Sequence, residues 1–326
     1  MVRLVRSHSG APLTARPADV ATSRCTVQRL IIRLTVAMAT SVLFTVTVVG
    51  GALWLITRPG EERGDASSQV SSGETADDPG MAHIHALGVN PADGLLYAAT
   101  HTGLFRVERS GQPSRIAGRF QDTMRFTVIG PDHFLASGHP DAREDLPPHL
   151  GLLESTDAGA TWDQVSLTGE ADLHALVLAG ERLYAADAAS GTVLVSDDRG
   201  LTWQAQGAAE LAVLVVDPRD PDRLFGAGYD GAAMLRRNAG RSWQEVEGPS
   251  LVAATWAGTG LVALASDGST HASAEPDGPW QRVGSFPGSG AALAADGETL
   301  YAATRDGRMF VSRDGGASWS SPDDTT

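Results

Sequence analysis

The sequence contains no lysine and only one cysteine, and both absences limit what the protein can do. All 25 of its basic residues are arginines, against 39 acidic residues. Cys25 precedes the apolar segment described below, so the chain beyond it has no disulfide and no cysteine for a metal site or a nucleophile. Residues 1–33 hold six arginines and one acid, which leaves 19 bases and 38 acids for the remainder. A surface this acidic repels phosphate backbones, so we expect no nucleic-acid partner.

A single long uncharged segment follows the basic N-terminal tail. It runs for 23 residues from Leu34 to Ile56, long enough to cross a bilayer and too long for the core of a typical signal peptide. Arginines precede it and Glu61 and Glu62 follow it, so the positive-inside rule places the N-terminus in the cytoplasm. The alternative is a signal peptide that is cleaved after Ala52. No cysteine follows the segment, which excludes a lipoprotein anchor.

These features predict a single-pass protein of the cell membrane whose folded part lies outside the cytoplasm. We expect a basic cytoplasmic tail over residues 1–33 and a transmembrane signal anchor over 34–57. A disordered acidic linker over 58–80 and a folded domain over 81–326 complete the chain. The membrane is then one partner of the protein, contacted through the N-terminal helix.

An eight-residue motif recurs through the folded part. Ser155–Trp162, Ser196–Trp203 and Ser312–Trp319 spell nearly the same letters, and Arg236–Trp243 and Ser273–Trp280 are altered copies. The five tryptophans are 41, 40, 37 and 39 residues apart. A period near forty in a strand-rich chain is typical of propeller blades. The sequence therefore predicts an all-β fold, a β-propeller.

Short apolar strands bounded by Gly, Asp and Pro turns occur in six equivalent pairs, so we predict six blades. A seventh, the alternative, would need the linker or an exchange of strands between blades. The predicted inner strands are His83–Val89, Met124–Ile129, His174–Leu178, Leu211–Val216, Leu251–Trp256 and Ala291–Ala295.

The motif S-x-D-x-G-x-T-W resembles the Asp box, or BNR repeat, of sialidases, sortilin-type receptors, xyloglucan hydrolases and photosystem assembly factors. With His83–Val89 (HIHALGV) and Ser137–Pro140 (SGHP), the chain resembles bacterial membrane-anchored Asp-box propellers that are often labelled glycosylhydrolase or sialidase-like. This resemblance implies the fold but not an activity, because enzymes and non-enzymes share the motif. Glycine at positive φ and an aspartate that accepts backbone N–H groups suit a tight turn, so we interpret the motif as structural.

Aligning the blades brings three sets of residues to the end of the ring opposite the motif turns. Just ahead of the inner strands lie His83, Asp122, Asp172, Glu210, Ser250 and Ser289. Two positions further on are His85, Met124, His174, Ala212, Val252 and Ala291. At or just after the ends of the second strands are His101, His139, Ala188, Tyr229, Asp267 and Arg305. Imidazoles and carboxylates therefore gather on blades one to three, whereas blade building alone would spread them evenly.

The first functional hypothesis is a metal or small-ligand site on this end of the ring. Its candidate ligands are His83, His85, His101, Met124, His139 and His174. Imidazole with thioether and without thiolate is a copper-like set, whereas imidazole with Asp122 or Asp172 also suits zinc or manganese. The alternative is that these groups only hydrogen-bond at the top of a water-filled channel.

The second hypothesis is a glycoside hydrolase, and whether the protein is an enzyme stays open. Glycoside hydrolysis needs two carboxyl groups, for which Asp122, Asp172 and Glu210 are the candidates. A sialidase is disfavoured because it needs an arginine cluster and a tyrosine nucleophile. Arg125 is expected to point into the interface between blades, which leaves only Arg305 with Tyr229.

The third hypothesis is a scaffold that binds a glycan or a protein partner. Residues 139–150 (HPDAREDLPPHL) form the longest insertion on the same end of the ring, and three prolines stiffen it. Such a loop can cover an axial site or contact a partner.

Overall fold

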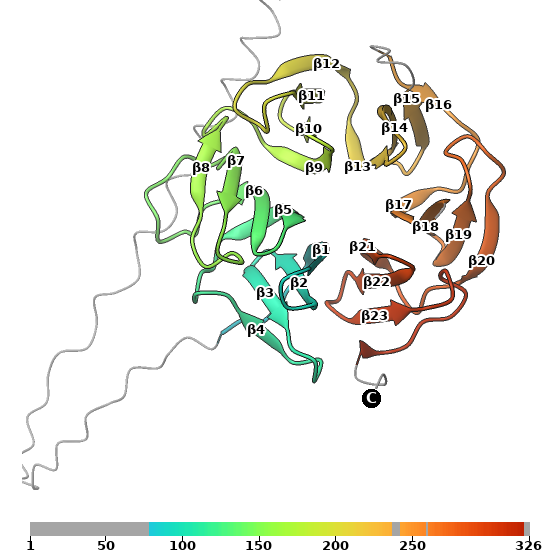
Figure 1. The fold of residues 1–326 in the computed structure, drawn as a ribbon, viewed down its shortest axis with the longest axis horizontal. Helices are drawn as coiled ribbons and strands as arrows, with labels where there is room; N and C mark the ends of the chain where they lie inside the picture. Colours follow the sequence, from blue (N-terminus) through green and yellow to red (C-terminus); the bar gives the residue numbers. More distant parts are fainter. Residues whose placement is uncertain (1–77, 237–241, 259, 323–326) are drawn as a thin grey trace, which may run out of the picture. The chain divides into compact units, whose positions relative to one another are not determined.

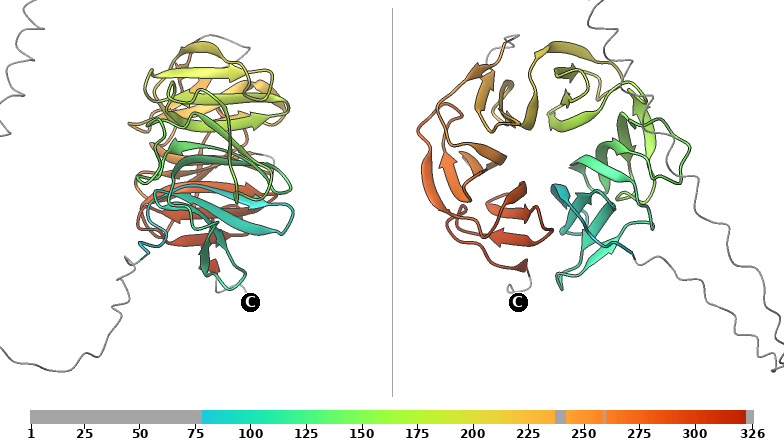
Figure 2. Two further views of the ribbon diagram at one scale, coloured as in Figure 1. Left: turned by 90° about the vertical axis from the view of Figure 1, so that its left-hand side faces the viewer. Right: turned by 180° about the vertical axis from the view of Figure 1, so that it is seen from behind.

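The computed structural model describes residues 78–236, 242–258 and 260–322, and these form six antiparallel sheets in a ring. Figure 1 shows the sheets radiating from a central axis in chain order. Figure 2 shows the same ring from the side and from behind. The predicted all-β propeller with six blades is confirmed, and the described residues contain no seventh sheet.

The strands of each blade follow one another from the axis outward. The inner strands are β1 (Ile84–Asn90), β5 (Asp122–Gly130), β9 (Leu173–Ala179), β13 (Leu211–Asp217), β17 (Leu251–Ala257) and β21 (Gly290–Asp296). The second strands are β2 (Leu95–Thr100), β6 (His133–His139), β10 (Arg182–Asp187), β14 (Asp220–Gly228), β18 (Gly260–Ala265) and β22 (Thr299–Thr304). The third strands are β3 (Gly103–Val107), β7 (Leu152–Ser155), β11 (Thr192–Ser196), β15 (Ala233–Arg236), β19 (Ser269–Ser273) and β23 (Met309–Ser312). The outer strands are β4 (Pro113–Arg115), β8 (Asp163–Ser166), β12 (Gln204–Ala208), β16 (Gln244–Glu245) and β20 (Gln281–Ser285).

The ring closes where the last inner strand meets the first. Strand β21 packs against β1, as β1 packs against β5 and so on around the axis. The sixth sheet has three strands, and an isolated bridge between Val311 and Ser320 stands in for its outer strand. The closing interface buries Ile84, Leu87 and Ala303 with Met81 and Tyr301 packed beside them.

Tryptophan side chains from the motif fill the other five interfaces between blades. Each packs against the blade that precedes its own: Trp203 of blade three, for example, lies on a cluster with Leu152 of blade two. The five are Trp162, Trp203, Trp243, Trp280 and Trp319. Large rings contribute much of the buried apolar area that joins neighbouring sheets.

The motif turns are closed by a fixed set of local hydrogen bonds. In the copy at 196–203, Gly200 N–H donates to Ser196 Oγ at 2.7 Å and Thr202 N–H donates to Asp198 Oδ1 at 2.8 Å. Gly200 has φ of 91°, and a Cβ there would lie 2.1 Å from Leu152 Cδ2. The copies at 155–162 and 312–319 repeat these bonds. We call the end of the ring that carries these three turns the motif rim.

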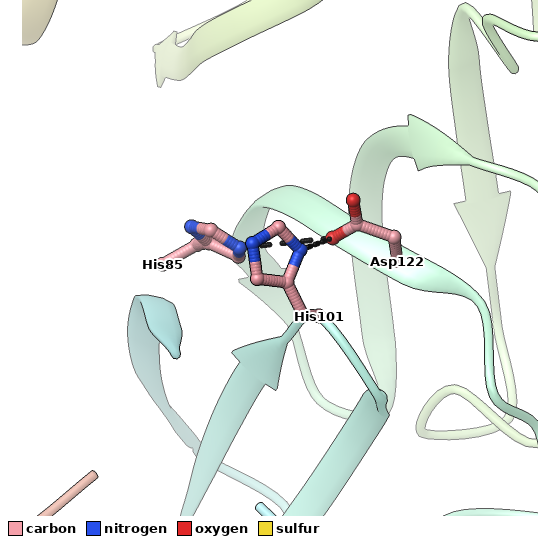
Figure 3. A group of neighbouring side chains, drawn as sticks. All are labelled: His85, His101 and Asp122. Carbon is pink, nitrogen blue, oxygen red and sulfur yellow. Dashed lines mark ion pairs between the residues drawn. The ribbon is translucent and has the colours of Figure 1, made fainter. Parts of the chain in front are cut away.

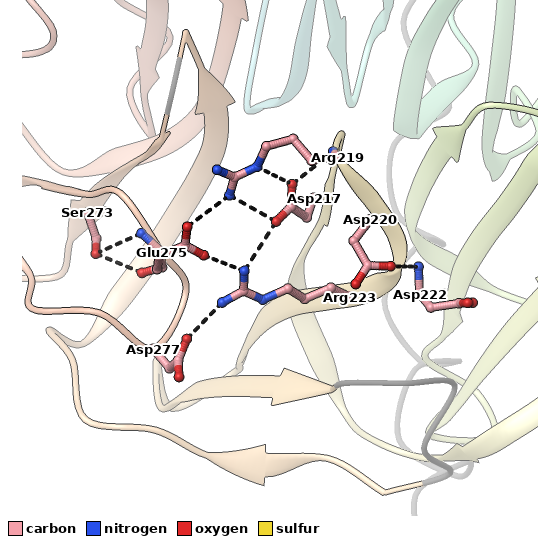
Figure 4. A network of polar contacts seen from close by, with 8 residues as sticks. All are labelled: Asp217, Arg219, Asp220, Asp222, Arg223, Ser273, Glu275 and Asp277. Atoms are coloured by element: carbon pink, nitrogen blue, oxygen red, sulfur yellow. Dashed lines mark hydrogen bonds and ion pairs between the residues drawn. The ribbon is translucent and has the colours of Figure 1, made fainter.

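One altered copy shows what happens when the pattern breaks. In the turn at 273–280 the position four residues after Glu275 is Pro279, which has no N–H to donate. Glu275 instead binds Arg219 at 3.3 Å and also binds Arg223, which reaches Asp277 at 2.8 Å. Figure 4 shows this network, which joins the hairpin of blade four to the turn of blade five. Ser273 keeps its hydrogen bonds to the backbone of Glu275, and a salt-bridge network between two blades replaces the bonds that the acidic side chain makes in the intact turns.

The predicted membrane segment and linker, residues 34–57 and 58–80, lie outside the described residues except for 78–80. Within the part of the chain that the structure describes, no helix is long and apolar enough to span a membrane. The membrane topology therefore stays a prediction.

Candidate functional site

Every inner strand has one bulged residue near its beginning. The ladder between the first and second strand skips a single residue in each blade. The skipped residues are His85, Met124, His174, Ala212, Val252 and Ala291. A bulge takes a side chain out of the regular alternation, and bulges are frequent beside functional sites. These six positions are one of the sets that the sequence predicted to share an end of the ring.

Arg125 binds the backbone of these bulges from inside the ring. Its guanidinium donates to the carbonyl oxygens of His85 at 2.8 Å and Ala212 at 3.0 Å, and also to that of His174. It contributes to the wall of a small axial cavity of about 140 Å³. The prediction that Arg125 points into the interface between blades is wrong, because the adjacent bulge at Met124 changes the alternation of the strand.

The first group of side chains at this end surrounds Asp122. His101 Nδ1 lies 2.9 Å and His85 Nε2 lies 3.6 Å from Asp122 Oδ1. Figure 3 shows both imidazoles directed at the same carboxylate oxygen. Neither His85 Nε2 nor Asp122 Oδ1 is exposed to solvent, and neither has an aligned hydrogen-bond partner among the described residues. Buried polar atoms are normally paired, so two unpaired atoms that face each other are a feature to explain.

The second group surrounds Asp172 in the neighbouring blade. His139 Nε2 lies 3.4 Å and His149 Nδ1 lies 3.7 Å from Asp172 Oδ1. His174 Nε2 lies 3.1 Å from the other oxygen of the same carboxylate. The backbone N–H of Asp172 donates to the buried carboxylate of Asp187 at 2.9 Å, which fixes the start of the strand.

His139 joins the two groups. Its Nδ1 makes a 3.0 Å hydrogen bond with Asp122 Oδ2, while its Nε2 faces Asp172. Beyond Asp172, His174 Nδ1 is paired with the hydroxyl of Tyr229 at 3.1 Å. A continuous polar chain therefore runs from blade one to blade four. We call the end of the ring that bears it the histidine rim, defined by His85, His101, Asp122, His139, His149, Asp172 and His174.

Burial favours the neutral form of two of these imidazoles. Desolvation, with the nearby His101 and despite the opposing charge of Asp122, lowers the pKa of His85 to about 4. Desolvation likewise lowers the pKa of His174, and the positive charge of Arg125 acts in the same direction. Neutral imidazole is the form that binds metal ions.

The structure brings together most of the residues that the sequence predicted. His85 and His101 meet at Asp122, and His139 and His174 meet at Asp172. His83 stands apart from both carboxylates: it adopts a φ of 49° and packs edge-on against His101, with ring centroids 5.3 Å apart.

Two other candidates lie near the histidine rim without joining either group. Met124 occupies the bulge of β5, where its carbonyl accepts a 3.3 Å hydrogen bond from Arg125. The exposed side chain of Glu210 lies beside Gly191, in the turn of blade three. Tyr229 pairs with His174, so it does not form the sialidase-like pair with Arg305.

Sequence reasoning missed His149 and the role of Arg125. His149 lies near the end of the insertion at 139–150. It is one of seven histidines between residues 83 and 174, and this clustering was the signal that could have included it among the candidates. Its contact with Asp172 depends on how the loop folds back, which no spacing rule gives. Arg125 was missed because the bulge beside it is set by the sheet as a whole.

No protein-family model and no curated protein matches the chain. Solved structures share its fold. The GH74 xyloglucanase from Xanthomonas campestris superposes with a TM-score of 0.51 at 19% identity, over 74% of this chain and 45% of that one. A putative gluconolactonase gives 0.53 at 18% identity, over 71% and 89% of the two chains. A chain of a nidogen/laminin complex gives 0.55 at 10% identity, over 69% and 90%.

These similarities show that the chain has a β-propeller fold. The chain spans less than half of the length of the xyloglucanase that it resembles. At such identities the likeness is one of fold alone, and the histidine rim has to be interpreted from its own chemistry.

Proposed function

We propose that this protein is a membrane-anchored, extracytoplasmic Asp-box propeller that binds a divalent transition-metal ion on its histidine rim. The ligands are His85 Nε2, His101 Nδ1 and Asp122 Oδ1. The single observation that carries this proposal is the convergence of these three residues: each offers a ligand atom within 4.8 Å of the other two, while His85 Nε2 and Asp122 Oδ1 are buried and make no hydrogen bond among the described residues. Small side-chain rotations suffice to bring them to ligand distances of about 2 Å from one ion.

The surroundings support metal binding over simple hydrogen bonding. The second oxygen of Asp122 accepts a hydrogen bond from His139 if that ring carries its proton on Nδ1, which orients the carboxylate. Carboxylates and carbonyls behind the first ligands hold metal sites in position in this way. Arg125 fixes the backbone carbonyl of His85 and so positions the strand that presents this ligand.

Two imidazoles with one carboxylate suit zinc or manganese, so we take zinc as the probe. Copper was the first candidate because Met124 supplies a thioether. A copper ion would draw on Met124 as a further ligand, which makes Met124→Leu the variant that separates the two cases.

Glycoside hydrolysis fits the same residues less well. A general acid must keep its proton beside the leaving group, yet Asp122 and Asp172 each have three imidazoles within 3.7 Å. The second catalytic candidate, Glu210, lies apart from this cluster beside Gly191.

The test is elemental analysis of the purified full chain, produced without a histidine tag and loaded separately with zinc, manganese and copper. We expect a tightly held zinc ion that is lost in His101→Ala and in Asp122→Asn. His133→Ala is the matched control, because His133 pairs with Glu154 at 2.6 Å on the opposite rim. Absence of bound metal from the folded wild-type chain, or equal retention in all variants, would overturn the proposal.

A further inference from the structure

The group around Asp172 repeats the geometry of the group around Asp122. In each, one carboxylate oxygen faces two imidazole nitrogens: Asp122 Oδ1 faces His85 and His101, and Asp172 Oδ1 faces His139 and His149. In each, a further histidine lies beside the second oxygen: His139 at 3.0 Å from Asp122, within a hydrogen bond, and His174 at 3.1 Å from Asp172. Neighbouring blades thus present the same three-ligand arrangement twice.

The second group also contains buried atoms that lack partners. Asp172 Oδ1 and His149 Nδ1 are inaccessible to solvent, and neither makes a hydrogen bond within the described residues. Together with a nitrogen of His139 they lie within 4.8 Å of one another. Leaving a buried carboxylate oxygen and a buried imidazole nitrogen unpaired at 3.7 Å is costly unless something binds between them.

The hydrogen bond of His139 determines which of its nitrogens is available. If Nδ1 carries the proton that is donated to Asp122 Oδ2, the lone pair of Nε2 points toward Asp172. A histidine that ligates a metal ion commonly donates its other N–H to a carboxylate. Asp122 is therefore both a ligand of the first ion and the residue that orients a ligand of the second.

We propose that the histidine rim holds two divalent metal ions, the second bound by His139 Nε2, His149 Nδ1 and Asp172 Oδ1. This inference rests on the proposed function, because it extends metal binding from one carboxylate to the next. The ion is of the same class as the first, one that accepts imidazole and carboxylate ligands. The two sites are coupled through the bond between His139 and Asp122.

The second ion has a structural consequence that the first lacks. His149 belongs to the insertion at 139–150, whereas Asp172 precedes β9 in the next blade. The insertion is already held to that blade by a 2.8 Å bond from Gly169 N–H to the carbonyl of His149. A metal ion between His149 and Asp172 adds a stronger connection through the side chain. Occupancy of the second site therefore fixes this loop over the histidine rim.

The experiment measures zinc stoichiometry and affinity for the full-length protein, three variants of the histidine rim and one control variant. Wild type should bind two zinc ions, whereas His149→Ala and His101→Ala should each bind one. His139→Ala should lose the second ion and bind the first about ten to a hundred times more weakly, as expected for loss of an orienting hydrogen bond. His133→Ala, on the motif rim, should bind two ions.

Limited proteolysis gives a second readout that does not depend on counting ions. The side chain of Arg143, in the insertion, is 68% exposed and offers trypsin a cleavage site. Zinc should slow cleavage after Arg143 in wild type and in His101→Ala, but not in His149→Ala.

The outcomes separate the two proposals. Two ions in wild type and one in His149→Ala, with loss of the protection, support the second site. One ion in wild type that is lost in His101→Ala and unaffected by His149→Ala would overturn the second site and leave the proposed function standing. Binding of no zinc would overturn both.

Discussion

The two rims of this propeller use polar side chains in opposite ways. On the motif rim each aspartate of the three intact turns is satisfied within its own turn, as Asp198 is by Thr202 at 2.8 Å and 2.6 Å. On the histidine rim Asp122 and Asp172 each keep one buried oxygen without a hydrogen bond. Both rims are therefore rich in carboxylates, but those of the three intact turns are saturated by their own turn, whereas Asp122 and Asp172 face imidazoles of other strands and loops.

The altered turn at 273–280 sharpens this comparison. There the side chain of Glu275 lacks the partners that Asp198 has within its turn, but it binds Arg219 and Arg223, and the guanidinium of Arg223 holds the pKa of Glu275 below its usual range. Where the acidic side chain of a turn on the motif rim lacks partners within the turn, charged neighbours from the preceding blade supply them. The histidine rim has no such replacement among its described contacts: the nearest arginine, Arg125, binds backbone carbonyls instead. Five of the buried side-chain atoms that lack a hydrogen bond among the described residues belong to the histidine rim and gather at two carboxylates, which is what the proposed metal binding would explain.

The largest effect is expected from removing a tryptophan on the motif rim. Trp203→Ala should lower the free energy of unfolding by about 3–5 kcal/mol, because removal of the indole ring leaves a cavity between blades two and three. Urea denaturation measures it, with Leu201→Ala as the control, since Leu201 lies in the same turn and is 67% exposed. Folded Trp203→Ala should still bind zinc. A loss below 1 kcal/mol would contradict the role assigned to the ring.

The next largest effect is expected from replacing Arg125, whose guanidinium donates hydrogen bonds to the backbone of the bulged residues of the histidine rim. Arg125→Met should cost about 2–4 kcal/mol of unfolding free energy, because it leaves the carbonyl oxygens of His85, His174 and Ala212 without donors. It should also weaken zinc binding, since His85 loses its backbone support. Arg305→Met, at an exposed position of blade six, is the control for loss of an arginine. Unchanged stability and zinc affinity in Arg125→Met would show that the guanidinium positions nothing.

Zinc itself should stabilise the fold by an amount that depends on the histidine rim. At a free concentration one hundred times the Kd, one ion raises the free energy of unfolding by about 2.7 kcal/mol. Asp122→Asn should remove the gain in stability that comes from the first site. Asp222→Asn is the control and should keep the gain, because Asp222 pairs with Arg182 on the motif rim. Thermal unfolding with and without zinc measures the difference. Equal gains in both variants would place the ion elsewhere.

The smallest effect concerns the carboxylates of the motif turns. Hydrogen bonds from Thr202 lower the pKa of Asp198 from 3.8 to about 2, and those from Ser318 do the same for Asp314. Because the folded pKa lies below the unfolded one, these groups contribute their full stability above pH 3.8 and lose it as the pH falls toward about 2. Asp198→Asn should flatten the dependence of unfolding free energy on pH in this window. An unchanged slope would mean that the turn does not prefer the ionised form.

The propeller and the rough position of the candidate site follow from the sequence alone. A spacing of 37 to 41 residues between tryptophans indicates propeller blades, and six equivalent pairs of short apolar strands give their number. Alternating strand directions then bring residues such as His101 and Asp122 to the same end of the ring without any knowledge of side-chain geometry. This is why six of the nine candidate site residues meet at two carboxylates.

Only the tertiary structure decided which atoms face each other. Bulges in the inner strands accompany the placement of His85 beside Asp122 and His174 beside Asp172 and direct Arg125 across the ring, and bulges depend on pairing with the next strand rather than on local sequence. His149 reaches Asp172 because its loop folds back over the next blade. Periodicity determines which side of a sheet a residue occupies, whereas contacts between loops and between blades depend on packing that no single segment encodes.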